Sequence, residues 1–203
     1  MTHQGSLTDA RPGQGAPLRI VAVSGSLHRP SSTTALVAAL AEAVAQRVPA
    51  EIEVVELAEL GPQLAGALDR RALTPQAALA VAAIEAADLL VVGSPVYRAS
   101  FTGLFKHLFD FVDQRSLVDV PVLLTATGGS HRHALTIEHQ LRPLFAFFQA
   151  LTLPVGVFAA SEDFEHGRVR CPALLERIES AADRALPYLR AHAAPAPVRP
   201  AAW

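Results

Sequence analysis

Apolar positions with two different periods alternate along this chain. Short runs rich in Val, Ile and Leu predict buried strands at residues 18–23, 52–55, 89–92, 121–125 and 153–158. Between them, apolar residues at helical spacing predict helices over residues 35–46, 74–87, 101–112, 131–148 and 174–189. Residues 57–73 are expected to form a longer irregular connection. Pro154 predicts an edge position for the last strand, because proline has no N–H to donate to a ladder.

Strands and helices that alternate five times predict a three-layer α/β sandwich around a five-stranded parallel sheet. With the strand order 2-1-3-4-5, right-handed crossovers bring the loops after strands one, three and four to one carboxyl edge. A ligand is then expected in the crevice between strands one and three. One domain is predicted over residues 18–192, between a disordered segment (1–17) and a loose tail (193–203).

The loop after the first strand is rich in hydroxyl groups. This hydroxyl loop, residues 24–34, has the sequence SGSLHRPSSTT and leads into a helix. Backbone N–H groups and the positive end of the helix dipole meet at such a junction, which suits a terminal phosphate. An ordinary helix cap by Ser31 or Ser32 is the alternative. The loop is not a Walker motif, since no Gly-Lys-Ser/Thr ends it, and it lacks the spaced glycines of a dinucleotide fingerprint.

Two further loops at the same edge have rigid backbones. Residues 94–98 have the sequence SPVYR, and residues 127–129 have the sequence TGG. Proline and glycine fix the backbone there and let main-chain N–H groups approach a ligand closely, although plain turns are the alternative. A phosphate site beside a place for a flat ring is best filled by FMN. Hydride transfer to a flavin needs no acid or base from the protein, because the cofactor carries the chemistry.

Composition and charge narrow the classes of protein. The chain has 203 residues, of which 51% are hydrophobic and 18% charged, and its net charge of −2 argues against a nucleic-acid surface. No segment has the length and apolar character of a membrane span or a signal peptide. The single cysteine, Cys171, excludes an internal disulfide and fits a cytoplasmic location. His131 and His133 have no carboxylate or thiol at ligand spacing, so no metal site is predicted.

Pro143 lies inside the helix expected over residues 131–148. Proline removes an N–H there and clashes with the carbonyl of His139, which predicts a plain kink or a π-type bulge around His139. Phe145, Phe147 and Phe148 form an aromatic patch that is either core or subunit interface. Because Phe145 and Phe148 share a face with Leu141 and Leu144, we expect this face to pack against another subunit.

Three of these stretches resemble the NAD(P)H-dependent FMN reductases of the flavodoxin-like superfamily. They are the hydroxyl loop, residues 94–106 (SPVYRAS with GLFK) and residues 126–143 (ATGGS through LRP). The resemblance extends over about residues 18–159. Within the superfamily, the chain resembles most the branch that supplies reduced flavin to sulfonate, sulfinate and sulfone monooxygenases in bacterial desulfurisation.

The resemblance implies a flavodoxin-like fold and a set of FMN-binding residues. Those expected at the FMN phosphate and ribityl chain are Ser24, Ser26, Arg29, Ser31, Ser32, Thr33 and Thr34. Those expected to flank the ring are Pro95, Val96, Tyr97 and Arg98. Those expected at its pyrimidine end are Thr127, Gly128 and Gly129. No catalytic side chain is implied, but His139 matches the place where relatives insert a bulge beside the flavin, which makes it a candidate for flavin transfer.

The resemblance also implies a reaction cycle. NADH or NADPH would reduce FMN, held as a substrate or a weakly bound prosthetic group, and FMNH₂ would leave for a flavin-dependent monooxygenase. A dimer or tetramer is expected, with no nucleic acid or membrane as partner. The alternatives are a quinone, azo or metal-ion reductase that holds FMN tightly, and a flavodoxin-type electron carrier without nicotinamide-dependent activity.

Overall fold

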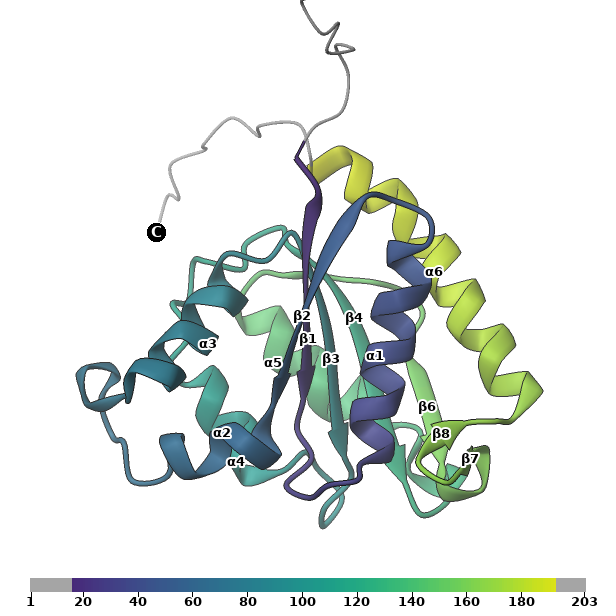
Figure 1. Cartoon of the computed structure of the whole chain (residues 1–203), viewed down its shortest axis with the longest axis horizontal. Helices are drawn as coiled ribbons and strands as arrows, with labels where there is room; N and C mark the ends of the chain where they lie inside the picture. Colours follow the sequence, from purple (N-terminus) through teal and green to yellow (C-terminus); the bar gives the residue numbers. More distant parts are fainter. Residues whose placement is uncertain (1–15, 193–203) are drawn as a thin grey trace, which may run out of the picture.

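A computed structural model of the chain describes residues 16–192. Residues 1–15 and 193–203, where most of the disordered segment and the loose tail are predicted, lie outside the described residues. The described part is a twisted sheet with helices on both faces (Figure 1).

The sheet has the predicted parallel order. Its strands in spatial order are β2 (Ala50–Glu56), β1 (Leu18–Ser24), β3 (Leu89–Pro95) and β4 (Pro121–Gly128), followed by β5 (Leu151–Thr152) and β6 (Val157–Ala160), which both pair with β4. The order 2-1-3-4-5 of a flavodoxin-like fold is therefore confirmed, with two short strands sharing the fifth place.

Helices cover the two faces of the sheet unequally. One face is covered by α1 (Ser32–Ala45) and α6 (Pro172–His192), and the other by α2 (Leu57–Leu64), α3 (Pro75–Glu85), α4 (Gly103–Phe109) and α5 (Arg142–Phe147) (Figure 1). The core beneath α1 and α6 is mostly aliphatic, whereas the core beneath the other helices contains a cluster of phenylalanines. The carboxyl ends of the strands meet at one edge, as parallel pairing requires.

The last predicted strand is divided into two. The N–H of Leu151 donates to the carbonyl of Val120, just before β4, and the N–H of Leu153 donates to Val122 of β4. The ladder then stops at Pro154, which has no N–H. The strand resumes at Val157 and runs to Ala160, two residues beyond the predicted end. A small hairpin of β7 (Phe164–Glu165) and β8 (Arg168–Val169) follows, which the sequence analysis did not predict.

The irregular connection expected over residues 57–73 is wrong in its first half. It contains α2, whose Leu57, Leu60 and Leu64 are buried on one face, and a short 3₁₀ helix at Arg70–Ala72. Gly61 and Pro62 suggested a break, but the leucines at helical spacing prevail because their burial stabilises the helix more than local propensity does. The helix expected over residues 101–112 is shorter and runs from Gly103 to Phe109.

The helix expected over residues 131–148 is interrupted, and a π-helix forms as one of the two predicted alternatives. A 3₁₀ turn at His131–His133 is followed by a π-helix at Ile137–Leu141 and then by α5. The N–H of Arg142 donates to the carbonyl of Ile137, five residues back. Pro143 then falls in the first turn of α5, where its missing N–H costs no intrahelical bond. The π-helix therefore places the proline where α5 begins.

The expectation that the face of Leu141, Leu144, Phe145 and Phe148 packs against another subunit is wrong for Leu141, Phe145 and Phe148. All three side chains are buried within their own domain, where the ring of Phe109 lies 4.9 Å from that of Phe145 and 4.9 Å from that of Phe105. Phe147 differs, because its side chain is 65% exposed. The aromatic patch is thus mostly core, since the sheet and α4 leave a large hydrophobic space that these rings fill.

Candidate functional site

A cleft of about 260 Å³ opens where the strands end. It is lined by Ser26, Pro30, Ser31, Ser32, Thr33, Pro95, Val96, Tyr97, Thr127, Gly128, Gly129, Ala160, Ser161 and Phe164. Most of these residues come from the three loops that the sequence singled out. The parallel sheet brings the loops together because each follows a strand that ends at the same edge.

One end of the cleft is formed by the hydroxyl loop and the start of α1. Ser31 caps this helix, and its hydroxyl accepts the N–H of Thr34 at 3.2 Å. Within the described residues, the N–H groups of Ser32 and Thr33 have no acceptor, as expected for the first turn of a helix. The first turn of α1 carries no acidic residue, so the positive end of its dipole remains available to an anion. This end suits a phosphate group.

The other end of the cleft has a rigid backbone frame. The N–H of Val96 donates to the carbonyl of Thr127 at 2.8 Å, and Tyr97 and Ser100 exchange backbone hydrogen bonds around a tight turn. Arg98 and Ala99 in this turn have φ angles of 50° and 68°, which place both in the left-handed region. The hydroxyls of Thr33 and Thr127 lie 2.6 Å apart and join the two ends of the cleft.

The donors of the cleft fit FMN. Free N–H groups and hydroxyls lie at the α1 end for a phosphate, and no heavy atom lies within 4 Å of where a Cβ of Gly129 would be, so that end is open to a ring. The lining contains no Asp, Glu, Lys, Arg or His. A phosphate would therefore be held by neutral donors and the helix dipole, without an ion pair.

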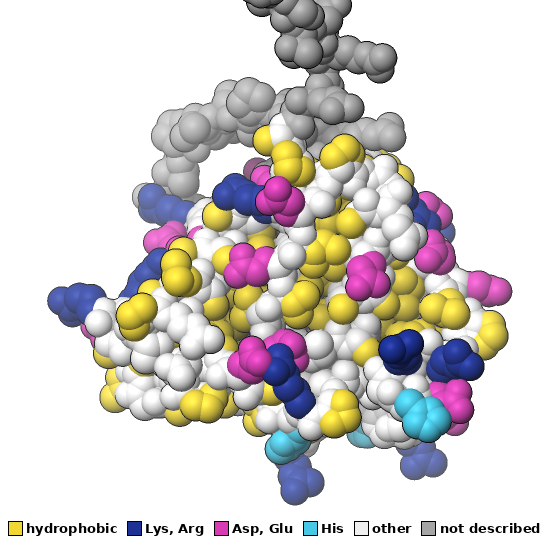
Figure 2. Space-filling model, viewed as in Figure 1, with side chains coloured by type: hydrophobic (Ala, Val, Ile, Leu, Met, Phe, Trp, Pro, Cys, Tyr) yellow, Lys and Arg dark blue, Asp and Glu magenta, His cyan; other side chains and the backbone are white. Residues whose placement is uncertain are grey.

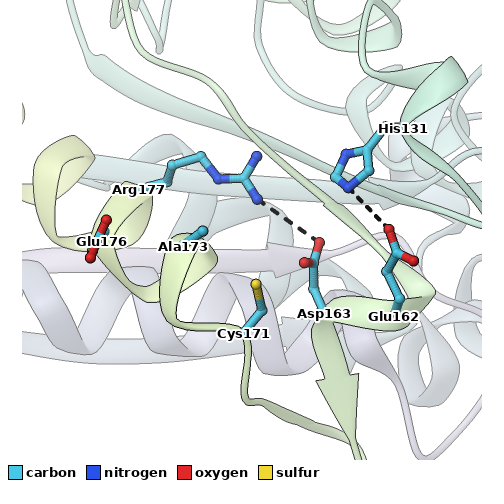
Figure 3. Close-up of a pocket in the computed structure, with 7 residues that line it drawn as sticks. All are labelled: His131, Glu162, Asp163, Cys171, Ala173, Glu176 and Arg177. Carbon is cyan, nitrogen blue, oxygen red and sulfur yellow. Dashed lines mark ion pairs between the residues drawn. The ribbon is translucent and has the colours of Figure 1, made fainter.

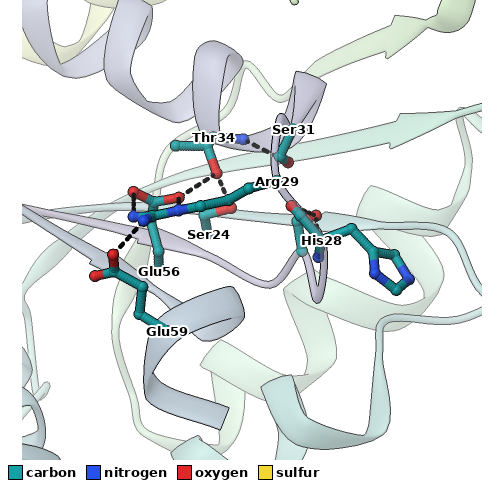
Figure 4. A network of polar contacts seen from close by, with 8 residues as sticks. Ser24, His28, Arg29, Ser31, Thr34, Glu56 and Glu59 are labelled. Atoms are coloured by element: carbon teal, nitrogen blue, oxygen red, sulfur yellow. Dashed lines mark hydrogen bonds and ion pairs between the residues drawn. The ribbon is translucent and has the colours of Figure 1, made fainter.

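Four of the predicted flavin-binding residues do not line the cleft. Ser24 is fully buried, and its hydroxyl lies 2.8 Å from that of Thr34, on the side of the loop away from the cleft. Arg98 is exposed outside the cleft. Arg29 forms ion pairs with Glu56 and Glu59 (Figure 4). Hydrogen bonds with Glu56 and then with Glu59 raise the pKa of the Arg29 guanidinium, so it stays charged.

The cleft also contains residues that the sequence analysis did not name. Ala160 and Ser161 follow β6, and they were missed because the last strand was predicted to end two residues too early. Phe164 belongs to the unpredicted hairpin, and Pro30 lies within the hydroxyl loop. A correct strand end would have indicated Ala160 and Ser161, because they occupy the same carboxyl edge as Thr127.

His139 lies in the π-helix, as predicted, but outside the lining of the cleft. Its side chain is exposed. The neighbouring Gln140 accepts a hydrogen bond from the hydroxyl of Ser100 at 3.0 Å. One side-chain bond therefore connects the π-helix to the turn that frames the ring end.

A larger but shallower hollow of about 780 Å³ lies beside the start of α6 (Figure 3). Its walls include the ion pair of Arg177 with Asp163, and His131 Nε2 lies 3.5 Å from Glu162 Oε1. Glu176 adds another carboxylate, so acidic groups outnumber basic ones and would repel a phosphate. The cleft, and not this hollow, suits the flavin.

The described residues offer neither a metal site nor a membrane-spanning helix. Residues 16–192 contain no cluster of His, Cys, Asp and Glu side chains that is able to hold a metal ion. The same residues include no helix with the length and apolar character that crossing a bilayer requires.

Comparison with known proteins supports the resemblance seen in the sequence. The family model described as NADPH-dependent FMN reductase matches residues 18–165. A protein named NADH-dependent FMN reductase SfnF from Pseudomonas putida is 56% identical over 82% of this chain and 90% of its own length. A protein named FMN reductase (NADPH) from Pseudomonas aeruginosa is 49% identical over 85% of this chain and 92% of its own length.

A solved structure agrees with these relatives. An oxidoreductase from Corynebacterium diphtheriae is 35% identical, covers 87% of this chain and 99% of its own, and superimposes with a TM-score of 0.78. The matched region contains all the strands of the parallel sheet and every residue that lines the cleft. The chain therefore belongs to the family of NADPH-dependent FMN reductases.

Proposed function

We propose that this protein is a cytoplasmic NAD(P)H:FMN oxidoreductase that supplies reduced FMN to a two-component flavin-dependent monooxygenase of organosulfur metabolism. The observation that carries the proposal is the cleft at the carboxyl edge, in front of the free first turn of α1. Family membership supports the reductase activity. The likeness of three sequence stretches to the desulfurisation branch supports the monooxygenase partner.

The residues of the cleft would bind and orient the flavin. Ser31, Ser32 and the first turn of α1 would hold its phosphate, while the frame of Pro95, Val96 and Gly128 would fix the plane of the ring. The flavin and the nicotinamide would supply the hydride chemistry themselves, so the cleft requires no acid or base. Its lining of neutral and apolar groups agrees with that requirement.

The absence of charge in the lining supports FMN as an exchangeable substrate. Hydrogen bonds between neutral groups contribute about 0.5–1.5 kcal/mol each, whereas bonds to charged groups contribute about 1.5–3 kcal/mol. A phosphate held by neutral donors is therefore bound with modest affinity. We expect the purified protein to be largely free of flavin and to show saturation kinetics with added FMN.

Steady-state kinetics with NADH or NADPH and added FMN, FAD or riboflavin test the proposal. Saturation with FMN at a lower KM than with riboflavin is the expected result. If flavin instead copurifies tightly bound and the rate does not depend on added FMN, the alternative of a quinone, azo or metal-ion reductase is favoured. Flavin binding without nicotinamide oxidation would favour the electron carrier.

We propose NADH as the preferred nicotinamide. Figure 2 shows side chains of Lys, Arg and His near the lower edge of the view, where the strands end, with side chains of Asp and Glu among them. Arg29 is engaged by Glu56 and Glu59, which leaves Arg98 as the candidate contact for the 2′-phosphate of NADPH. A lower KM for NADH is expected, and Arg98→Ala should raise only the KM for NADPH. A preference for NADPH would contradict the proposal.

We further propose that His139 and its π-helix assist the release of reduced flavin. The support is the bond between Ser100 and Gln140, which couples the π-helix to the frame at the ring end. His139→Ala should retain more FMN on purification and transfer less of it to an oxygenase, while Gln149→Ala, an exposed position after α5, serves as a control. Unchanged retention would limit the π-helix to a structural role.

A homo-oligomer, dimer or tetramer, remains part of the proposal, but on a different surface. Exposed Phe147 lines a hollow of about 540 Å³ together with Lys106, Val112 and Leu144. Light scattering at micromolar concentration should give at least a dimer, and Phe147→Ser should reduce the measured mass. A monomer of the unmodified chain would contradict this proposal.

A further inference from the structure

One carboxylate outside the cleft contacts the hydroxyl loop at several points. Glu56 is the last residue of β2, and its side chain is only 17% exposed. It accepts hydrogen bonds from Arg29, from Nη2 at 2.5 Å and from Nε at 3.0 Å (Figure 4). It also accepts the hydroxyl proton of Thr34 at 3.2 Å. One short side chain therefore contacts both the middle and the end of the loop.

The start of the loop joins the same network. The hydroxyls of Ser24 and Thr34 lie 2.8 Å apart. Because Thr34 donates its only hydroxyl proton to Glu56, the hydroxyl of Ser24 is the donor in this pair. The backbone N–H of Thr34 in turn donates to Ser31, the cap of α1. Glu56 is thus linked to the first residue, the middle and the last residue of the loop.

Arg29 faces this network and not the cleft. Its Nε and Nη2 bind Glu56 and its Nη1 binds Glu59, so each nitrogen of the guanidinium is engaged. Arg29 is also absent from the lining of the cleft, whose donors are all neutral. A neutral donor contributes to binding only where its geometry is right, because hydrogen bonds weaken steeply with misalignment. The binding of a phosphate here depends on the shape of the loop.

We propose that Glu56 is a positioning residue that sets the shape of the hydroxyl loop for the flavin phosphate, and that Arg29 acts through Glu56 without touching the phosphate. The inference rests on the proposed binding of FMN in the cleft. In this proposal, the positive charge of Arg29 serves to hold the shape of the hydroxyl loop. The proposal also assigns recognition of the phosphate to Ser31, Ser32 and the N–H groups of α1.

The proposal predicts a selective effect on phosphorylated flavin. Riboflavin lacks the phosphate, so its binding depends on the ring end of the cleft. Disturbing the hydroxyl loop should therefore weaken the binding of FMN far more than the binding of riboflavin. Hydride transfer takes place at the ring, so kcat at saturating FMN should stay close to that of the unmodified protein. Glu56→Gln keeps an acceptor oxygen for Thr34 but loses the charge that holds Arg29, and should have an intermediate effect.

Calorimetric titration of the full chain with FMN and with riboflavin tests these expectations. Glu56→Ala should raise the Kd for FMN at least tenfold and the Kd for riboflavin less than threefold. Arg29→Ala should raise the Kd for FMN to a similar extent. The double variant should be no worse than Glu56→Ala, because two residues that act through one interaction are not additive.

The chain provides a closely matched control. Arg70 and Glu85 form another two-bond pair, in which the arginine is 49% and the glutamate 17% exposed, against 48% and 17% for Arg29 and Glu56. This pair joins the 3₁₀ helix at Arg70–Ala72 to α3 and does not line the cleft. Glu85→Ala should lower the melting temperature comparably and leave the ratio of the two Kd values unchanged.

Different outcomes overturn different parts of the proposal. If Arg29 binds the phosphate directly, Glu56→Ala will free it and strengthen FMN binding, and the two substitutions will not be equivalent. If Glu56→Ala or Glu56→Gln weakens the binding of FMN and riboflavin equally, Glu56 only supports the fold in general and does not position the loop for the phosphate. If the unmodified protein binds FMN and riboflavin with equal affinity, the proposed phosphate site is wrong. This measurement tests the proposed function without any variant.

Discussion

The two ends of the cleft are built in different ways. At the hydroxyl end, a regular strand leads into a regular helix, and hydroxyl pairs and the Glu56 network hold the loop. At the ring end, left-handed residues in the turn after β3 and a π-helix bonded to that turn replace regular elements. Irregular elements open more easily than well-bonded regular ones. We therefore expect the hydroxyl end to hold the phosphate in a fixed geometry and the ring end to adjust its shape around the ring.

The largest effect is expected at the hydroxyl end, from the double substitution Ser31→Ala and Ser32→Ala. It removes the cap of α1 and two hydroxyls of the cleft. At about 1 kcal/mol for each neutral hydrogen bond, the Kd for FMN should rise roughly 30-fold. Flavin titration measures this, with Ser130→Ala as a control outside the cleft. An equal rise for riboflavin would mean that this end does not select the phosphate.

A somewhat smaller effect is expected at the ring end, from Arg142→Ala. Arg142 binds Glu138 through Nε at 2.5 Å and Nη2 at 2.8 Å, and donates through Nη1 to the carbonyl of Leu153 at 3.1 Å. It therefore ties the π-helix to the break in the last strand. Its loss should lower the free energy of unfolding by about 1.5 kcal/mol and speed the dissociation of FMN.

Urea unfolding and stopped-flow release of FMN measure the two effects of Arg142→Ala. Arg170→Ala, whose 67% exposed side chain pairs with Glu165, is the control and should change stability by less than about 0.5 kcal/mol. If Arg142→Ala leaves the rate of FMN release unchanged, the stability of the ring end does not control flavin exchange.

A smaller change is expected from Thr125→Val, in β4 near the hydroxyl end. Within the described residues, the buried hydroxyl of Thr125 is a side-chain group without a hydrogen-bond partner, in contrast to the paired hydroxyls of Thr33 and Thr127. Replacing it with an apolar group of the same shape should leave stability unchanged or raise it by up to about 1 kcal/mol. Denaturant unfolding measures this, and a clear loss would show that the hydroxyl is hydrogen-bonded in solution.

The smallest effect concerns pH at the ring end. A hydrogen bond with Arg142 lowers the pKa of Glu138 below its ordinary value of 4.5. Its contribution to stability is therefore present above pH 4.5 and is lost as the pH falls through the lower pKa of the folded state. Because Glu138 is 46% exposed, the contribution should not exceed about 0.5 kcal/mol.

Comparing unmodified protein with Glu138→Gln shows whether this pair supports the π-helix. The difference in unfolding free energy should be present at pH 7 and vanish in acid. A difference that persists below the lowered pKa of Glu138 would assign the stabilisation to the shape of the side chain and not to its charge.

Local patterns were sufficient for the order of the strands in the sheet and for the place of the hydroxyl loop, and they narrowed the region of Pro143 to two alternatives. Period and burial determine strands such as β1 and β3, whose side chains are almost all buried, and parallel pairing then fixes which loops meet. Pro143 limited its helix to a kink or a bulge, because the clash of proline with the preceding turn is a local property of the chain. Ten of the residues predicted to bind flavin line the cleft for the same reason.

Only the tertiary structure decided where side chains with more than one possible partner would point. Arg29 lies in the hydroxyl loop, and nothing local indicates that Glu56 and Glu59, on the neighbouring strand and helix, draw its charge away from the cleft. The spacing of Phe145 and Phe148 in the sequence is the same whether they face another subunit or the core of their own domain. Their packing against the ring of Phe109 shows that they belong to the core. Long-range contacts of this kind depend on which elements become neighbours, which periodicity does not encode.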